Sequence, residues 1–112
     1  MTVTSDSSGS QTATLDTEHT LATISTQGVY SLWVDTNAMV GGSSPDITRI
    51  KVYGKARTGD TERLLDIFQF KGVQARPLFR SPLYETPHHL KFTLEQTDGT
   101  GRAYPWEVRK IA

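Results

Sequence analysis

The sequence predicts an all-β fold: an antiparallel β-sandwich, jelly-roll-like, with a flexible N-terminal arm. Apolar residues recur at every second position in several short runs, as expected of strands with one buried face. Turn-forming Gly, Pro and Asp residues separate these runs about every ten residues, a spacing typical of a sandwich. No window of about a dozen residues holds the apolar period of a helix. We therefore expect about six or seven short strands and little or no helix.

Length and composition predict the domain organisation. The chain has 112 residues, an ordinary size for one domain. Residues 1–20 include ten Ser or Thr and only scattered apolar side chains, too few to offset the entropy of ordering. We expect residues 1–19 to form a flexible Ser/Thr-rich arm and residues 20–112 to form the β-sandwich domain. Such an arm either has no role or becomes ordered against a neighbouring molecule.

The clearest strands lie in the middle of the chain. Residues 29–35 alternate but are largely apolar on both faces, which is typical of a strand covered on both sides. Residues 47–57 alternate strictly, with small or apolar side chains on one face and charged or aromatic ones on the other. The Thr-Gly-Asp turn at 58–60 predicts that residues 62–71 return as a hairpin partner.

The faces of the later strands predict the core. In the 62–71 strand, Leu64, Phe68 and Phe70 are expected to share one face, although an acidic residue interrupts them, which leaves open that this face is half exposed. Residues 89–97 and 102–111 also alternate, and the Asp-Gly turn between them predicts a second hairpin. A proline in the last strand points to a sheet edge. The inward side chains of this pair are expected to meet in one core: Phe92, Leu94, Tyr104, Trp106 and Val108.

The residues that usually carry catalysis or metal binding are sparse. The chain has no Cys, which excludes disulfides, thiolate nucleophiles and zinc–thiolate sites. His88 and His89 are adjacent and would point to opposite faces of an extended segment, and His19 lies in the expected arm. No Gly-x-Ser-x-Gly elbow or phosphate-binding loop occurs. We therefore expect no enzyme, no metal and no cofactor.

The sequence also lacks features of membrane proteins and of secreted proteins. No apolar run approaches the roughly 20 residues needed to span a bilayer. The first residues lack the basic start and apolar stretch of a secretory signal. The prediction is synthesis in a cytoplasm and no contact with a membrane.

The net charge is zero, but the charges are segregated along the chain. Residues 1–48 carry five acidic residues and no Lys or Arg, whereas residues 49–112 carry all twelve cations against seven acids. Such a split indicates an interaction surface, either between copies of the chain or between a basic face and an acidic partner. The alternative is that the fold interleaves both halves and mixes the charges.

A row of basic side chains with one Tyr among them projects from one face of the 47–57 strand. Such a face either is simply solvated, or binds protein, or binds single-stranded nucleic acid. The neutral chain argues against nucleic acid, since domains that bind it are usually strongly basic. The candidate protein-contact residues are Arg49, Lys51, Tyr53, Lys55 and Arg57 in this strand, with Asp16 and Glu18 in the arm.

Three stretches carry a resemblance to a known group. They are GVYSLWVDTNAMV at 28–40, KVYGKAR at 51–57 and TDGTGRAYPW at 97–106. The chain resembles small structural proteins of tailed bacteriophages, and in size and fold it is similar to the capsid cement (decoration) proteins of short-tailed phages. The resemblance implies a virion protein on the capsid surface that binds the major capsid protein, or another virion protein. It also implies stabilisation of the shell against internal DNA pressure, as a dimer or trimer.

The alternative function is a carbohydrate- or receptor-binding sandwich of a phage tail or fibre. Aromatic side chains stack on sugars when they are exposed, and four aromatic residues are candidates for this role: Trp33, Tyr53, Tyr104 and Trp106. Their alternation with polar residues fits core positions for most of them.

Overall fold

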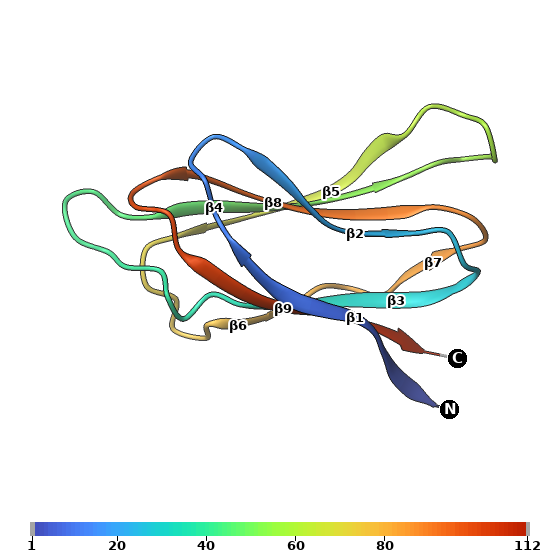
Figure 1. Ribbon diagram of the computed structural model, residues 1–112, viewed down its shortest axis with the longest axis horizontal. Coiled ribbons are helices and arrows are strands. Elements are labelled where there is room, and N and C mark those ends of the chain that lie inside the picture. The colour runs from blue at the N-terminus through green and yellow to red at the C-terminus, as the bar shows by residue number, and fades with distance from the viewer. Residues whose placement is uncertain (1, 112) are drawn as a thin grey trace.

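The structure is a computed structural model that describes residues 2–111, and it consists of two antiparallel sheets packed face to face (Figure 1). The described residues contain no helix, and hence none long and apolar enough to cross a membrane. The strands are β1 (Val3–Thr12), β2 (Glu18–Ile24), β3 (Gly28–Asp35), β4 (Ile47–Gly54), β5 (Arg63–Lys71), β6 (Leu78–Arg80), β7 (Tyr84–Thr86), β8 (Leu90–Asp98) and β9 (Ala103–Ile111).

The strand order is that of a jelly roll. One sheet, called sheet A, has the order β1-β9-β3-β6, and β7 pairs with the other end of β3. Sheet B has the order β2-β8-β4-β5. Most connections between successive strands pass from one sheet to the other, as in the two Greek keys of a jelly roll. The prediction of an all-β, jelly-roll-like antiparallel sandwich is confirmed.

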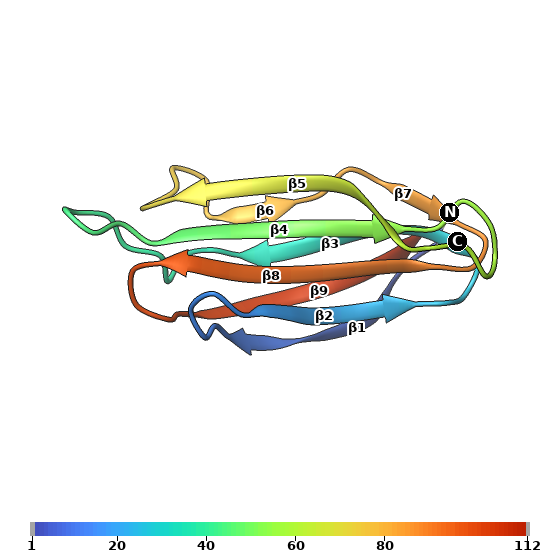
Figure 2. The ribbon, with the colours of Figure 1, turned by 90° about the horizontal axis from the view of Figure 1, so that it is seen from above.

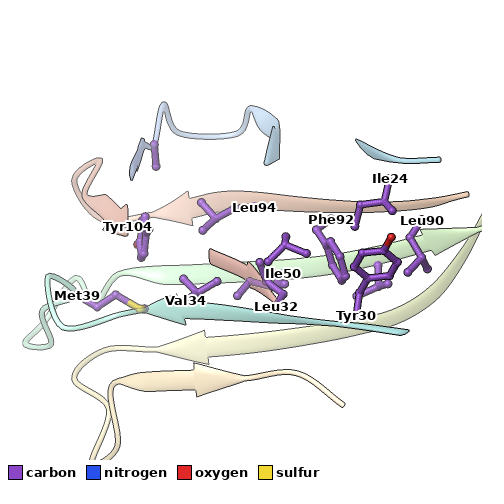
Figure 3. Packing of buried hydrophobic residues seen from close by; sticks show 13 residues of the cluster. Ile24, Tyr30, Leu32, Val34, Met39, Ile50, Leu90, Phe92, Leu94 and Tyr104 are labelled. Carbon is purple, nitrogen blue, oxygen red and sulfur yellow. The ribbon is translucent and has the colours of Figure 1, made fainter. Parts of the chain in front are cut away.

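The core lies between the two sheets and is built by buried residues of five strands, β2, β3, β4, β8 and β9 (Figure 3). Central strand β3 contributes Tyr30, Leu32 and Val34, all fully buried, and β8 contributes three residues from the opposite sheet. The predicted inward positions of the last two strands are confirmed, with Trp106 only partly buried against the cluster. The other fully buried apolar side chains on strands are Ile50, Val52, Leu90, Phe92, Leu94, Tyr104 and Val108.

The predicted hairpin between the last two strands is wrong. β8 belongs to sheet B and β9 to sheet A, so the Asp-Gly turn crosses between layers instead of joining neighbours. The buried side chain of Gln96 explains the crossing. Its Nε2 donates to the carbonyls of Asp98 (2.9 Å) and Thr100 (2.7 Å), and its Oε1 accepts from the backbone N of Arg102 (3.1 Å). The two strands still share one core because their inner faces oppose each other.

The expectation of a flexible arm over residues 1–19 is also wrong where the structure describes it. Residues 3–12 form β1, which pairs with β9 from Val3↔Ile111 to Thr12↔Ala103. Residue 1 lies outside the described residues, as does residue 112 of the expected domain. The polar composition correctly indicated little burial, because most side chains of β1 are exposed. Strand pairing uses the backbone and needs no apolar side chains when a neighbouring strand offers an open edge.

The unexpected strand β1 also changes the position of the last strand in its sheet. Its proline predicted a sheet edge, but β9 lies between β1 and β3. Pairing with β3 extends only as far as Trp106, so Pro105 lies beyond that ladder and faces Ser10 of β1. The proline therefore costs the β3–β9 ladder no hydrogen bond.

Candidate protein-binding side

The predicted basic row lies partly on the outer face of sheet B. Arg49, Lys51 and Tyr53 project from β4 on that face, each about half-buried between its neighbours. Lys55 follows the end of the strand, and Arg57 lies in the turn, where its Nε donates to the Asp60 carboxylate at 3.0 Å. The five residues therefore do not form one continuous basic row.

Glu18 of β2 neutralises the middle of this row. Its carboxylate accepts hydrogen bonds from the hydroxyls of Tyr53 (2.6 Å) and Thr93 (2.7 Å) and lies 3.9 Å from Lys51 Nζ. Lys51 also lies 3.4 Å from Glu95. Burial alone would raise the pKa of Glu18, but these donors and the ammonium groups outweigh it and hold that pKa below its ordinary value. Burial and the bond to Glu18 raise the pKa of the Tyr53 hydroxyl to about 12.

A second cluster continues the network along the same face. Lys91 Nζ lies 2.8 Å from the Glu62 carboxylate and 4.7 Å from the centre of the Tyr53 ring. The same carboxylate forms a short hydrogen bond with His89 Nε2. Burial would raise the pKa of Glu62, but the bonds from Lys91 and His89 outweigh it and lower that pKa. The face is thus covered by ion pairs that the chain makes with itself.

The fold therefore interleaves the two charged halves of the sequence on this face. Glu18 forms an ion pair with Lys51 and accepts a hydrogen bond from Tyr53. The sequence predicts all three as contacts of a partner protein, but here they contact one another. Asp16 lies apart, in the turn before β2, at a left-handed backbone position with φ 61°. Interaction through these residues stays a prediction, and any partner would have to compete with the internal ion pairs.

One end of the sandwich is held together by a buried carboxylate. Asp46 has no exposed surface and accepts hydrogen bonds from the backbone N of Val40 (2.9 Å) and of Thr100 (3.1 Å). Arg102 Nε donates to it at 2.9 Å. Burial would raise the pKa of Asp46, but these bonds outweigh it and hold the pKa below its ordinary value. Every oxygen has a partner, so the cluster stabilises the loops at this end and offers no free group for chemistry.

The exposed apolar side chains gather on a different part of the molecule. Six of the nine large hydrophobic residues that are exposed lie between residues 64 and 83, on β5, β6 and their connections. These strands run along one lateral edge of the sandwich (Figure 2). Ile67 is 50% exposed and Leu65 is 53% exposed. We call this edge the β5–β6 side, with the exposed apolar residues Leu64, Leu65, Ile67, Val73, Leu78 and Leu83.

A β-bulge explains why Leu64 of β5 faces solvent. The register shifts between Val52↔Asp66 and Tyr53↔Leu64, so Leu65 is an extra residue. Leu64 therefore points outward, and the expectation that it shares a face with Phe68 and Phe70 is wrong. The inner face instead carries Asp66, whose carboxylate accepts a 2.7 Å hydrogen bond from the Tyr84 hydroxyl. Burial and this bond raise the pKa of Tyr84 far above its ordinary value.

The β5–β6 side also carries cations without carboxylate partners. Residues 63–80 contain four cations and one acid, Asp66, which is turned inward to Tyr84. None of the four takes part in an ion pair within residues 2–111, in contrast to the ion pairs of Lys51 and Lys91. They are Arg63, Lys71, Arg76 and Arg80, all exposed. Apolar side chains with unpaired cations nearby are characteristic of surfaces that bind protein.

The sequence contained a signal for this side that alternation alone did not reveal. The pairs Leu64-Leu65 and Ile67-Phe68 are consecutive apolar residues within one strand. In a strand, adjacent side chains point to opposite faces, so each pair places one apolar side chain outside. The unpaired state of the cations depends on which strands are neighbours and could not be predicted without the topology.

Two hollows in the surface are further candidate binding sites. One hollow of about 550 Å³ lies at the Asp46 end and is lined mainly by polar groups such as Ser44, Lys71 and Asp98. A smaller one of about 210 Å³ lies on the outer face of sheet A beside Trp33, Asp35 and Glu107. Within residues 2–111, no three His, Cys, Asp or Glu side chains gather in the way a metal ion requires.

Comparison of the chain with protein-family models, with curated proteins and with solved structures finds no match.

Proposed function

We propose that this chain is a structural protein that works by binding other protein through the β5–β6 side, and that it catalyses no reaction. The observation that carries the proposal is the concentration of exposed apolar side chains and unpaired cations on one edge of the sandwich. A folded chain gains nothing in stability by exposing residues such as Ile67 and Leu65 there. Covering them against a partner removes apolar surface from water, and the surrounding cations favour an acidic partner.

The more specific proposal concerns the setting, which is the outer surface of a virion shell. There the chain would bind the major capsid protein and stabilise the shell against the pressure of packaged DNA. The support is the resemblance carried by residues 28–40, 51–57 and 97–106. Jelly rolls occur both in viral capsid domains and in lectins, so the fold agrees with this setting but does not select it.

The test is sedimentation of the purified chain with shells assembled from the capsid protein encoded in the same genome. We expect the chain to pellet with shells and to ignore unassembled subunits. Ile67→Lys should reduce the bound fraction, because it places a charge in the apolar part of the β5–β6 side. Val40→Lys is the matched control, since Val40 is a similarly exposed aliphatic residue on the β3–β4 loop. Equal binding by both variants, or none by the wild type, contradicts the proposal.

Carbohydrate binding is a second candidate, favoured by the position of Trp33. This ring lies half-buried on the outer face of sheet A, at the hollow that it shares with Asp35 and Glu107. Aromatic faces beside carboxylates can hold a sugar. However, the Arg109 guanidinium lies 3.9 Å from the centre of the ring and already occupies part of it. Of the other aromatic candidates, Tyr104 is fully buried.

A further inference from the structure

The two lateral sides of the sandwich carry opposite charge. β1 and β2 form one side and the β5–β6 side is the other, as Figure 2 shows from above. Residues 2–24, which build the first side, contain Asp6, Asp16 and Glu18 and no Lys or Arg. The opposite side carries four cations that pair with no carboxylate of residues 2–111. Acidic and basic side chains are therefore mixed on the outer face of sheet B, but they remain separated between the two lateral sides of the sandwich.

The directions of the edge strands match as well. Every pairing in both sheets is antiparallel, and four strands lie across each sheet. With an even number of strands, the two edge strands of a sheet run in opposite directions. A second copy placed beside the first in the same orientation therefore presents an antiparallel strand to each edge, β2 to β5 in sheet B and β1 to β6 in sheet A.

The edge at β5 is open to such addition. β5 is nine residues long and contains no proline, and its outer backbone groups have no strand partner. An edge of this length with exposed apolar residues favours pairing with another strand. The neighbouring edge of sheet A is less able to pair with another strand. There β6 and β7 have three residues each, and three prolines interrupt the segment from 77 to 87.

We propose that the β5–β6 side of one copy binds the β1–β2 side of a second copy, head to tail, with β2 of the second copy added to β5. The inference rests on the proposed function, since it names the partner of the same side. A two-fold contact between two β5–β6 sides would bring like charges together, including Arg63 near Lys71 of the other copy. The head-to-tail contact instead places Asp6 and Asp16 against these cations and covers Ile67 and its apolar neighbours.

The test uses two variants that each alter one side. Lys71→Glu with Arg76→Glu removes the net positive charge of the β5–β6 side. Asp6→Lys with Asp16→Asn removes the net negative charge of the other side, while position 16 keeps a residue type that tolerates the left-handed turn. All four side chains are exposed. Asp98→Lys is the control, because it alters an exposed carboxylate at the end of the sandwich. Molar mass is measured by sedimentation equilibrium over a concentration series, and melting curves check folding.

We expect the wild type and the control to self-associate above the 12.4 kDa chain mass, and less so at high salt. Each double variant alone should show a dissociation constant raised about tenfold or more. An equimolar mixture of the two should regain association as a heterodimer, because the unaltered acidic side of one variant binds the unaltered basic side of the other. A monomeric wild type overturns the proposal. Wild-type association by either variant alone also overturns the proposal, because it indicates a two-fold contact through the unaltered side of that variant. A mixture that stays dissociated overturns it as well.

The self-association experiment tests the head-to-tail contact separately from the proposed function, because it contains no shells. Shell binding by a chain that never self-associates overturns the head-to-tail contact alone. Self-association by a chain that ignores shells overturns the virion setting alone.

Discussion

Arg102 donates a 2.9 Å hydrogen bond from Nε to Asp46, and so joins the basic half of the sequence to the acidic half. The carboxylate is completely buried, whereas the arginine side chain is 28% exposed. Asp46 also accepts from the backbone of the β3–β4 loop and of the β8–β9 turn. One side chain therefore ties together two loops that are 54 residues apart in sequence.

Replacing Asp46 with Asn should destabilise the fold by about 3 kcal/mol near neutral pH. Loss of one partner of a buried pair costs about 3–5 kcal/mol, and Arg102 can turn partly to water, which favours the lower end. Urea unfolding of the variant and the wild type at pH 7 measures the difference. A cost below about 1 kcal/mol would show that the single backbone hydrogen bond that the Asn oxygen can still accept supplies most of the stabilisation.

The effect of pH on the same pair has a definite sign. The folded-state pKa of Asp46 is held below its unfolded value, so the unfolded state binds the proton first as the pH falls. The contribution is fully present above the unfolded pKa of about 3.9 and is lost as the pH falls through the folded pKa. We expect the stability difference between wild type and Asp46→Asn to shrink below about pH 4. A difference that stays constant from neutral to strongly acidic pH would contradict this assignment.

Gly99 and Gly59 provide a matched pair for testing the β8–β9 turn. Both adopt left-handed backbone angles, φ 87° and 88°. A Cβ at Gly99 would collide with the Asp46 carboxylate and lie 2.9 Å from its Cα, whereas nothing lies within 4 Å at Gly59. Gly59→Ala should therefore cost only the backbone strain of about 1–2 kcal/mol. Gly99→Ala should cost about 1–3 kcal/mol more through overpacking, measured by thermal unfolding. Equal costs would show that the loop yields easily.

Sequence alternation predicted the sandwich, its central strand and most core positions, because burial on one face imposes a period of two. It failed where the backbone or a single polar side chain decides the structure. β1 forms through backbone pairing with β9 and buries almost no side chain. The path of the β8–β9 turn depends on hydrogen bonds to Gln96, and the exposure of Leu64 depends on a bulge. The β5–β6 side follows from strand neighbours, which alternation does not specify.

Amide hydrogen exchange of β1 tests the strand in place of the expected arm. In an antiparallel edge strand, backbone N–H groups point alternately to the neighbouring strand and to solvent. We expect alternate amides between Val3 and Thr12 to exchange slowly, with an irregularity at the bulge between Ser5 and Ser7. Uniformly fast exchange along the segment would restore the flexible arm. Removal of residues 1–12 should lower the melting temperature, because it leaves the β9 edge unpaired.

Trp106 and Trp33 separate the stability of the fold from ligand binding. Trp106 packs against the core from its inner position on β9, so Trp106→Ala should cost about 3 kcal/mol, the lower end for large buried truncations because the ring is only partly buried. For a chain of this size the melting temperature should fall by about 12 °C or more. Trp33 lies outside the core and packs against Arg109, so Trp33→Ala should cost only about 1 kcal/mol.

A glycan array with both variants completes the test. Glycan binding by the wild type that Trp33→Ala abolishes, with the melting curve nearly unchanged, would favour the carbohydrate-binding function over the protein-binding one. A melting temperature unaffected by Trp106→Ala would contradict its place in the core.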